Sequence, residues 1–100
     1  MKVVWSVVAE QRVIEAFEAI ASDRPAAAVR WLRELLTKVE SLDRFAKRGR
    51  KVPEIGKSPY RQLQHYPYRV VYRVDATQVV VITVRHSRRA WDPSEVAQDG

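Results

Sequence analysis

Hydrophobic residues recur through the first half of the chain with the spacing of helices. Val13, Phe17 and Ile20 follow one another at intervals of four and three residues, and charged residues fall between them. This spacing gathers the apolar side chains on one side of a helix. It predicts a helix over residues 7–22, with the hydroxyl of Ser6 as its N-cap.

A second helix is predicted directly after a break at Asp23-Arg24-Pro25, since proline is well tolerated in a first helical turn. Its apolar stripe consists of Ala28, Leu32, Leu35, Val39 and Leu42, widened by Trp31 and Leu36. Two such helices joined by a tight break form an antiparallel hairpin. The stripe is compatible with a groove for a partner, but packing against a core is the favoured interpretation.

The second half of the chain has the pattern of strands. Residues 68–74 and 78–84 are rich in valine and are separated by a short polar turn, which predicts two antiparallel strands. Weaker strand patterns cover residues 2–5 and 60–66. The predicted order β-α-α-β-β-β is an α+β fold with a helical hairpin on a small, mainly antiparallel sheet. We expect one domain over residues 1–89 and a loosely held tail over residues 90–100.

Strand alternation predicts which side chains share a face of the sheet. In the first valine-rich strand, Tyr68, Val70, Tyr72 and Val74 oppose Arg69, Val71 and Arg73; in the second, Val80, Ile82, Val84 and His86 oppose Val79, Val81, Thr83 and Arg85. The helices must cover one face. We expect the other face to gather the arginines, including Arg61, in an accessible basic patch. For Arg69, an ion pair with Glu54 or Asp75 is the alternative.

Composition narrows the class of protein. One hundred residues without a cysteine make one domain with neither a disulfide framework nor a cysteine metal site, and we expect no metal or cofactor. No secretory signal or membrane span is evident, which favours a cytoplasmic protein. Residues 1–43 carry six Lys and Arg against seven Asp and Glu, whereas residues 44–100 carry twelve against five. This asymmetry favours an anionic partner, either a nucleic acid or an acidic protein.

Three smaller signals have ordinary explanations. Gly56-Lys57-Ser58 ends like a phosphate-binding loop, but Lys51 occupies the position where that motif requires a glycine. His65 is isolated, which favours a hydrogen-bonded structural role. The basic run over residues 44–51 has the composition of a solvated loop, although next to a nucleic acid it could hold phosphates.

The chain resembles toxins of the RelE/ParE superfamily, which belong to bacterial type II toxin–antitoxin systems. The resemblance runs from about Val3 to Arg89 and implies the same β-α-α-β-β-β fold. It depends on an ordered set of segments: Trp5-Ser6, Pro25-Ala26-Ala27-Ala28, Gly49-Arg50, Val52-Pro53-Glu54, Arg61-Gln62-Leu63, Pro67-Tyr68-Arg69-Val70-Val71-Tyr72-Arg73 and Val84-Arg85-His86-Ser87-Arg88-Arg89.

The resemblance leaves the cellular target open. ParE-like members bind and poison DNA gyrase without catalysis, and the valine-rich strands and the terminal arginines favour this branch. RelE-like members are ribosome-dependent mRNA endoribonucleases; for that alternative the matching residues are Glu54, Arg61, Arg69 and His86. No tyrosine follows His86 and Trp91 has no ionisable hydroxyl, which weakens the nuclease analogy. A relative that has lost toxicity is a third possibility.

Either branch implies a cognate antitoxin with an acidic, partly disordered tail. The residues expected to bind the target or the antitoxin are Arg61, Arg69, Arg73, Arg85, His86, Arg88 and Arg89.

Overall fold

A computed structural model describes residues 1–52 and 60–89 of the chain. The elements are β1 (Lys2–Trp5), α1 (Val7–Ala21), α2 (Pro25–Glu40), the 3₁₀ turn η1 (Ser41–Asp43), β2 (Arg50–Lys51), β3 (Tyr60–His65), β4 (Tyr68–Val74) and β5 (Gln78–His86). The predicted α+β succession is confirmed, and β2 is an additional short strand inside the basic run. The predictions for Glu54 and for the tail over residues 90–100 concern positions outside the described residues.

Ser6 fixes the point where the chain leaves the sheet and enters the first helix. Its hydroxyl accepts a hydrogen bond from the backbone N–H of Ala9 at 3.0 Å, which confirms it as the N-cap of α1. The same hydroxyl donates to the carbonyl oxygen of Ile82 at 2.9 Å. The backbone N–H of Ser6 donates to the carbonyl of Val81 at 3.0 Å. One residue therefore anchors α1 to β5.

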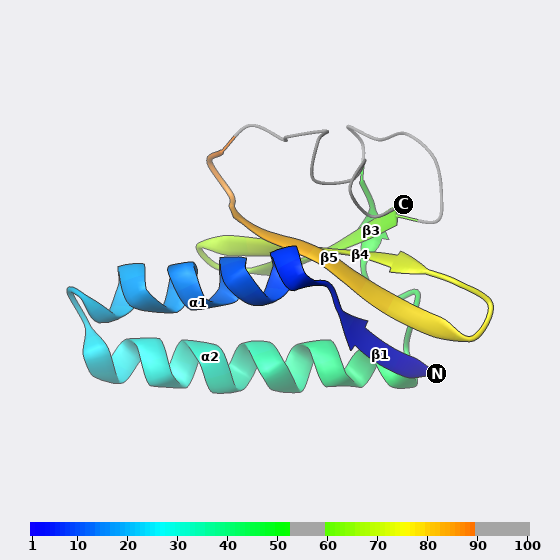
Figure 1. The fold of residues 1–100 in the computed structure, drawn as a ribbon, viewed down its shortest axis with the longest axis horizontal. Coiled ribbons are helices and arrows are strands. Elements are labelled where there is room, and N and C mark those ends of the chain that lie inside the picture. Colours follow the sequence, from blue (N-terminus) through cyan, green and yellow to red (C-terminus); the bar gives the residue numbers. More distant parts are fainter. Residues whose placement is uncertain (53–59, 90–100) are drawn as a thin grey trace.

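The helices α1 and α2 form the expected hairpin and lie on one face of the sheet (Figure 1). Pro25 occupies the start of α2. The buried helical residues are Ala9, Val13, Ala16, Ala28, Trp31, Leu35 and Val39, and all except Ala28 pack in one cluster with strand residues. Core packing is thus confirmed for most of the predicted stripe, while Leu36 stays 41% exposed. Within the described residues, neither helix is long and apolar enough to cross a bilayer.

The five strands form one sheet in the order β1-β5-β4-β3-β2. The pair β1–β5 is parallel and the other three pairs are antiparallel. The first strand therefore lies beside the last one. Because β1 pairs only with Gln78–Val81, the second half of β5 pairs with β4 alone in the described part of the chain, and α1 runs beside it.

A β-bulge in β5 changes the face assignment predicted from strict alternation. Val71 pairs with Thr83 but Tyr72 pairs with Val81, so Ile82 is an extra residue opposite β4. Val84 consequently packs in the same helix-side cluster as Val79 and Val81. The predicted grouping of Val84 and His86 with Val80 and Ile82 is wrong, because alternation assumes one residue per partner along the whole strand.

The far face of the sheet is also buried. Val52, Val71, Val80 and Ile82 form a second apolar cluster there, with Tyr60 packed against it. Arg69, which lies on that face next to the turn between β3 and β4, is only 8% exposed. The predicted accessible basic patch across this face is therefore wrong, and the accessible cations must be sought at the ends of the strands.

Candidate functional site

The structure separates the arginines that were expected to lie together. Arg61 pairs with Tyr72, which belongs to the helix-side core, whereas Arg69 pairs with Gln64 and Arg85. Paired residues share a face of the sheet. Arg61 and Arg69 therefore lie on opposite faces, and a single patch containing both does not exist.

Arg69 is buried and hydrogen-bonded within the sheet. Its Nη1 donates to the side-chain oxygen of Gln62, itself buried, at 3.0 Å. Asp75, one of the two carboxylates proposed as its partner, instead binds Arg73 through two hydrogen bonds of 2.8 and 3.0 Å. That interaction holds the pKa of the Asp75 carboxyl below its ordinary value and raises the pKa of Arg73. Neither arginine presents a fully accessible guanidinium.

The three described residues of the nuclease alternative, Arg61, Arg69 and His86, do not form a catalytic group. His86 lies at the level of Tyr68 and His65 in the sheet, while Arg61 lies four residues further along β3. At the rise of an extended strand, four residues span roughly 13 Å. Arg61, Arg69 and His86 thus cannot contact one phosphate together, and Glu54 lies outside the described residues.

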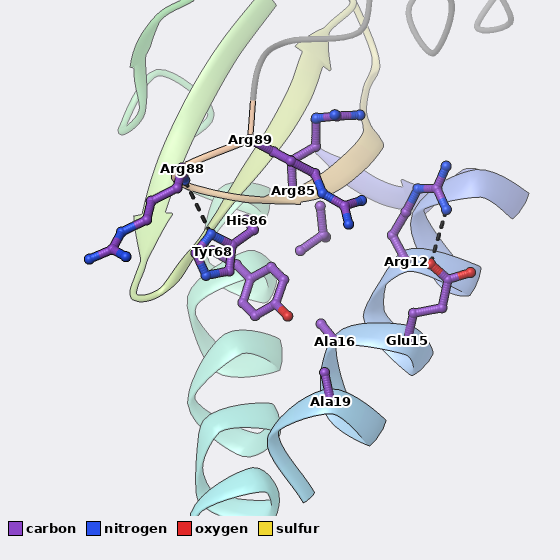
Figure 2. Close-up of a pocket in the computed structure, with 10 residues that line it drawn as sticks. Arg12, Glu15, Ala16, Ala19, Tyr68, Arg85, His86, Arg88 and Arg89 are labelled. Carbon is purple, nitrogen blue, oxygen red and sulfur yellow. Dashed lines mark hydrogen bonds and ion pairs between the residues drawn. The ribbon is translucent and has the colours of Figure 1, made fainter. Parts of the chain in front are cut away.

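Cations do converge at the end of β5. Figure 2 shows Arg12 and Glu15 of α1 on one side of a cavity at the end of β5, with Tyr68 of β4, beside His86, on the other side. This cavity of about 330 Å³, here called the arginine cavity, is lined by Arg12, Glu15, Ala16, Ala19, Tyr68, Val84, Arg85, His86, Arg88 and Arg89. Figure 2 shows the guanidinium groups of Arg12 and Arg89 turned toward the cavity, whereas the Arg85 side chain points away from it, in line with its pairing with Arg69 on the far face of the sheet. The arginines around the cavity still outnumber its one carboxylate, Glu15, which gives it a net positive charge. Its alanine, valine and tyrosine surfaces make the remaining wall apolar.

Glu15 and His86 are both engaged within this cavity. Nη1 of Arg12 donates to Glu15 at 3.0 Å, an ion pair between neighbouring turns of α1. The backbone N–H of Arg88 donates to Nδ1 of His86 at 3.2 Å, and the His86 ring packs edge-on to Tyr68 at a centroid distance of 5.2 Å. Because Nδ1 accepts from the backbone, the His86 ring is fixed as part of the wall. Arg88 and Arg89 are exposed.

This arrangement can bind an anionic group without any catalytic step. A carboxylate or phosphate entering the cavity would meet guanidinium donors, which form strong charge-assisted hydrogen bonds. The described residues contain no group of three or more His, Cys, Asp and Glu side chains that could hold a metal ion. The predicted residues that the structure brings together are therefore Arg85, His86, Arg88 and Arg89.

Arg12 is the cavity residue that sequence reasoning missed. It lies on the polar side of α1, where the helical pattern suggests only solvent. Its position becomes informative once the parallel pairing of β1 with β5 places α1 beside the end of β5. The spacing of hydrophobic and polar residues does not determine the order of the strands in the sheet, so the position of Arg12 could not be predicted from it.

Comparison with known proteins identifies the family. Residues 3–91 match the family model described as the ParE toxin of the type II toxin-antitoxin system, parDE. The chain belongs to the ParE toxin family. A solved structure described as the chromosomal ParDE TA system from P. aeruginosa is similar to this ParE chain with a TM-score of 0.71 at 17% identity. The match covers 86% of this chain and 95% of the other and shows the shared fold. No curated protein matches the sequence.

A second basic surface of this ParE chain lies away from the arginine cavity. The segment from Arg44 to Lys51, here called the basic loop, is held by the buried side chain of Tyr72. The Tyr72 hydroxyl accepts from the N–H of Gly49 at 2.8 Å and donates to the carbonyl of Ala46 at 2.8 Å. Burial raises the pKa of this phenol above its ordinary value. The hydroxyl therefore stays protonated and keeps both bonds.

Arg61 also helps to hold the basic loop in place. Its Nη1 donates to the carbonyl oxygen of Gly49 at 2.8 Å. A side chain at position 49 would collide with its surroundings, because a Cβ there would lie 2.5 Å from the carbonyl oxygen of Gln62 and 2.7 Å from the Tyr72 hydroxyl. Arg61, which was predicted to bind a target or antitoxin, thus also positions the basic loop.

Proposed function

We propose that this ParE toxin arrests growth by binding DNA gyrase, and that a cognate antitoxin with an acidic, partly disordered tail neutralises it. The observation that carries the proposal is the family match over residues 3–91. The arginine cavity supports it, since it offers a binding surface of concentrated positive charge. The described residues offer no convergent set for RNA cleavage, which favours a binding mechanism over a nuclease.

Binding rather than turnover has a measurable consequence. A toxin that acts by occupying gyrase inhibits in proportion to the fraction of gyrase bound, so purified protein should inhibit supercoiling over a concentration range comparable with that of the enzyme. A nuclease would destroy many mRNA molecules per toxin. The test is a titration of the toxin against gyrase supercoiling of relaxed plasmid, run beside a translation reaction containing ribosomes and mRNA.

Charge reversal connects the activity to the arginine cavity. Arg88→Glu combined with Arg89→Glu should weaken inhibition of gyrase by about tenfold or more, because like charges across an interface cost several kcal/mol. Both residues are exposed, so the fold should survive. The matched control is Arg24→Glu with Arg30→Glu, at the exposed N-cap of α2 and at an exposed position within it, which makes the same change in net charge. Supercoiling unaffected by the toxin, with ribosome-dependent cleavage of mRNA, would refute the proposal.

The antitoxin part of the proposal rests on charge complementarity. An acidic tail laid against the end of β5 would neutralise exposed cations and cover the cavity at the same time. Its affinity for the purified toxin should fall as salt is raised and fall further in the Arg88 and Arg89 double variant, measured by calorimetry. If the antitoxin binds the wild-type toxin and the double variant with equal affinity at every salt concentration, it binds elsewhere on the toxin.

A further inference from the structure

The basic loop combines dense positive charge with an exposed aromatic ring. Its five cations are Arg44, Lys47, Arg48, Arg50 and Lys51; all are exposed, and the segment contains no acidic residue. Phe45 lies among them with 62% of its surface exposed. Burying a phenylalanine is worth roughly 1.5–3 kcal/mol. A phenylalanine left in water within such a charged segment is therefore unexplained by folding alone.

The loop is fixed in its conformation. Phe45 N–H donates to the carbonyl of Ser41 at 3.0 Å, and the N–H of Arg48 donates to the carbonyl of Phe45 at 2.9 Å. Nη1 of Arg48 binds the Ser41 hydroxyl at 2.7 Å. With the Tyr72 contacts to Ala46 and Gly49, these bonds hold the segment at both ends. The exposed ring is consequently presented by a defined backbone.

The exposed ring and its neighbouring cations border one shallow hollow. It has a volume of about 770 Å³ and is lined by Met1, Asp43, Arg44, Phe45, Ala46, Lys47 and Arg48. Among the described residues, Arg44, Lys47 and Lys51 form no ion pair with a carboxylate. The positive charge also acts on Lys38, whose pKa is lowered by burial and by the charge of Arg48. The hollow therefore offers Arg44 and Lys47, which form no ion pair with a carboxylate in the part of the chain that the structure describes.

We propose that the basic loop is a nucleic-acid-binding site, in which Arg44 and Lys47 contact the phosphodiester backbone of a single strand and Phe45 stacks on an unpaired base. Cations that follow the backbone, combined with an aromatic platform, are the recurring device for single-stranded nucleic acids. An acidic peptide would use the charges but leave the ring without a role, which favours the nucleic acid.

This site is separate from the arginine cavity. The two hollows share no lining residue. The basic loop continues from η1, which contacts β1 and β5, and β1 pairs with the first residues of β5. The arginine cavity lies at the other end of β5. The proposal therefore stands independently of whether gyrase is the target.

The test measures binding of the full chain to a fluorescent single-stranded oligonucleotide and to a duplex by anisotropy, at several salt concentrations. Phe45→Ala should weaken single-strand binding about five- to 160-fold, the range for loss of one stacked base, and leave duplex binding and the salt dependence unchanged. Phe45→Trp keeps a stacking surface and should retain the affinity. Circular dichroism checks that each variant is folded.

Neutralising the cations should change the salt dependence of binding, which Phe45→Ala leaves unchanged. Arg44→Gln with Lys47→Gln should reduce the slope of log affinity against log salt by about 1.4, since each phosphate contact to a single strand contributes about 0.7. Arg24→Gln with Arg30→Gln, at exposed positions near the start of α2, is the control with equal charge change.

Three results would overturn the proposal. Equal loss in the two double variants would mean that net charge alone attracts the oligonucleotide. Unchanged single-strand affinity in Phe45→Ala would remove the stacking role. Binding of polyglutamate with the same loss on Phe45→Ala would identify an acidic protein as the ligand instead.

Discussion

Replacing Tyr72 by phenylalanine tests whether the buried hydroxyl holds the basic loop. The substitution keeps the ring but removes one acceptor for the Gly49 N–H and one donor to the Ala46 carbonyl. Gly49 is buried, so its N–H loses its partner away from water, at a cost of about 1–3 kcal/mol. The half-buried Ala46 carbonyl can be partly hydrated, which adds about 1 kcal/mol.

The expected total is a loss of about 3 kcal/mol in the free energy of unfolding, measured by urea denaturation followed by circular dichroism with an unchanged m value. For a domain of this size, that corresponds to a fall in Tm of about 12–24 °C. Tyr66→Phe is the matched control, because Tyr66 is 85% exposed and its hydroxyl is in solvent. We expect the control to change stability by less than about 0.5 kcal/mol.

The same variant has a signature in its pH dependence. The pKa of Tyr72 is raised in the folded protein, so its stabilising effect is fully present below the ordinary tyrosine pKa of about 10 and is lost as pH rises through the folded value. The wild type should therefore lose stability more steeply above about pH 10 than Tyr72→Phe. If Tyr72→Phe is as stable as the Tyr66→Phe control at pH 7, the reasoning about the loop is refuted.

Two further predictions concern neighbouring contacts. Gly49→Ala should lower the free energy of unfolding by about 2–4 kcal/mol, because the new Cβ would meet the Gln62 backbone oxygen, which cannot move without disturbing β3. Urea unfolding measures this loss, and a loss below about 0.5 kcal/mol would contradict the prediction. The pKa of Asp75 is lowered by Arg73, so the pair stabilises the fold above the ordinary carboxyl pKa and the effect disappears as pH falls through the folded value. NMR titration of the Asp75 carboxyl should show a higher pKa in Arg73→Gln than in the wild type, and an unaltered titration would rule the pairing out.

The secondary structure could be predicted because the helices and long strands are strongly periodic. Ser6 as N-cap, Pro25 at the start of α2 and the buried stripe of α2 all followed from local chemistry. The short strand β2 could not be predicted, since two charged residues carry no alternation. It exists because Arg50 and Lys51 find partners on β3.

The site was only half predictable for reasons of register. Arg85, His86, Arg88 and Arg89 are close in sequence, so their proximity at the end of β5 followed directly. The positions of Arg61 and Arg69 depended on how β3 and β4 align, which single-strand alternation does not determine. The bulge at Ile82 likewise reverses the faces in the second half of β5.

The parallel pairing of β1 with β5 has a consequence for synthesis. Residues 2–5 are synthesised well before residues 78–81, which supply the backbone that completes their pairing. At a translation speed of about 5–20 residues per second, the first strand waits on the order of 4–15 s for its neighbour. Nascent chains that stop before residue 78 lack both the docking strand for β1 and the guanidinium groups that follow it. The arginine cavity therefore cannot assemble until residues 78–89 have been synthesised.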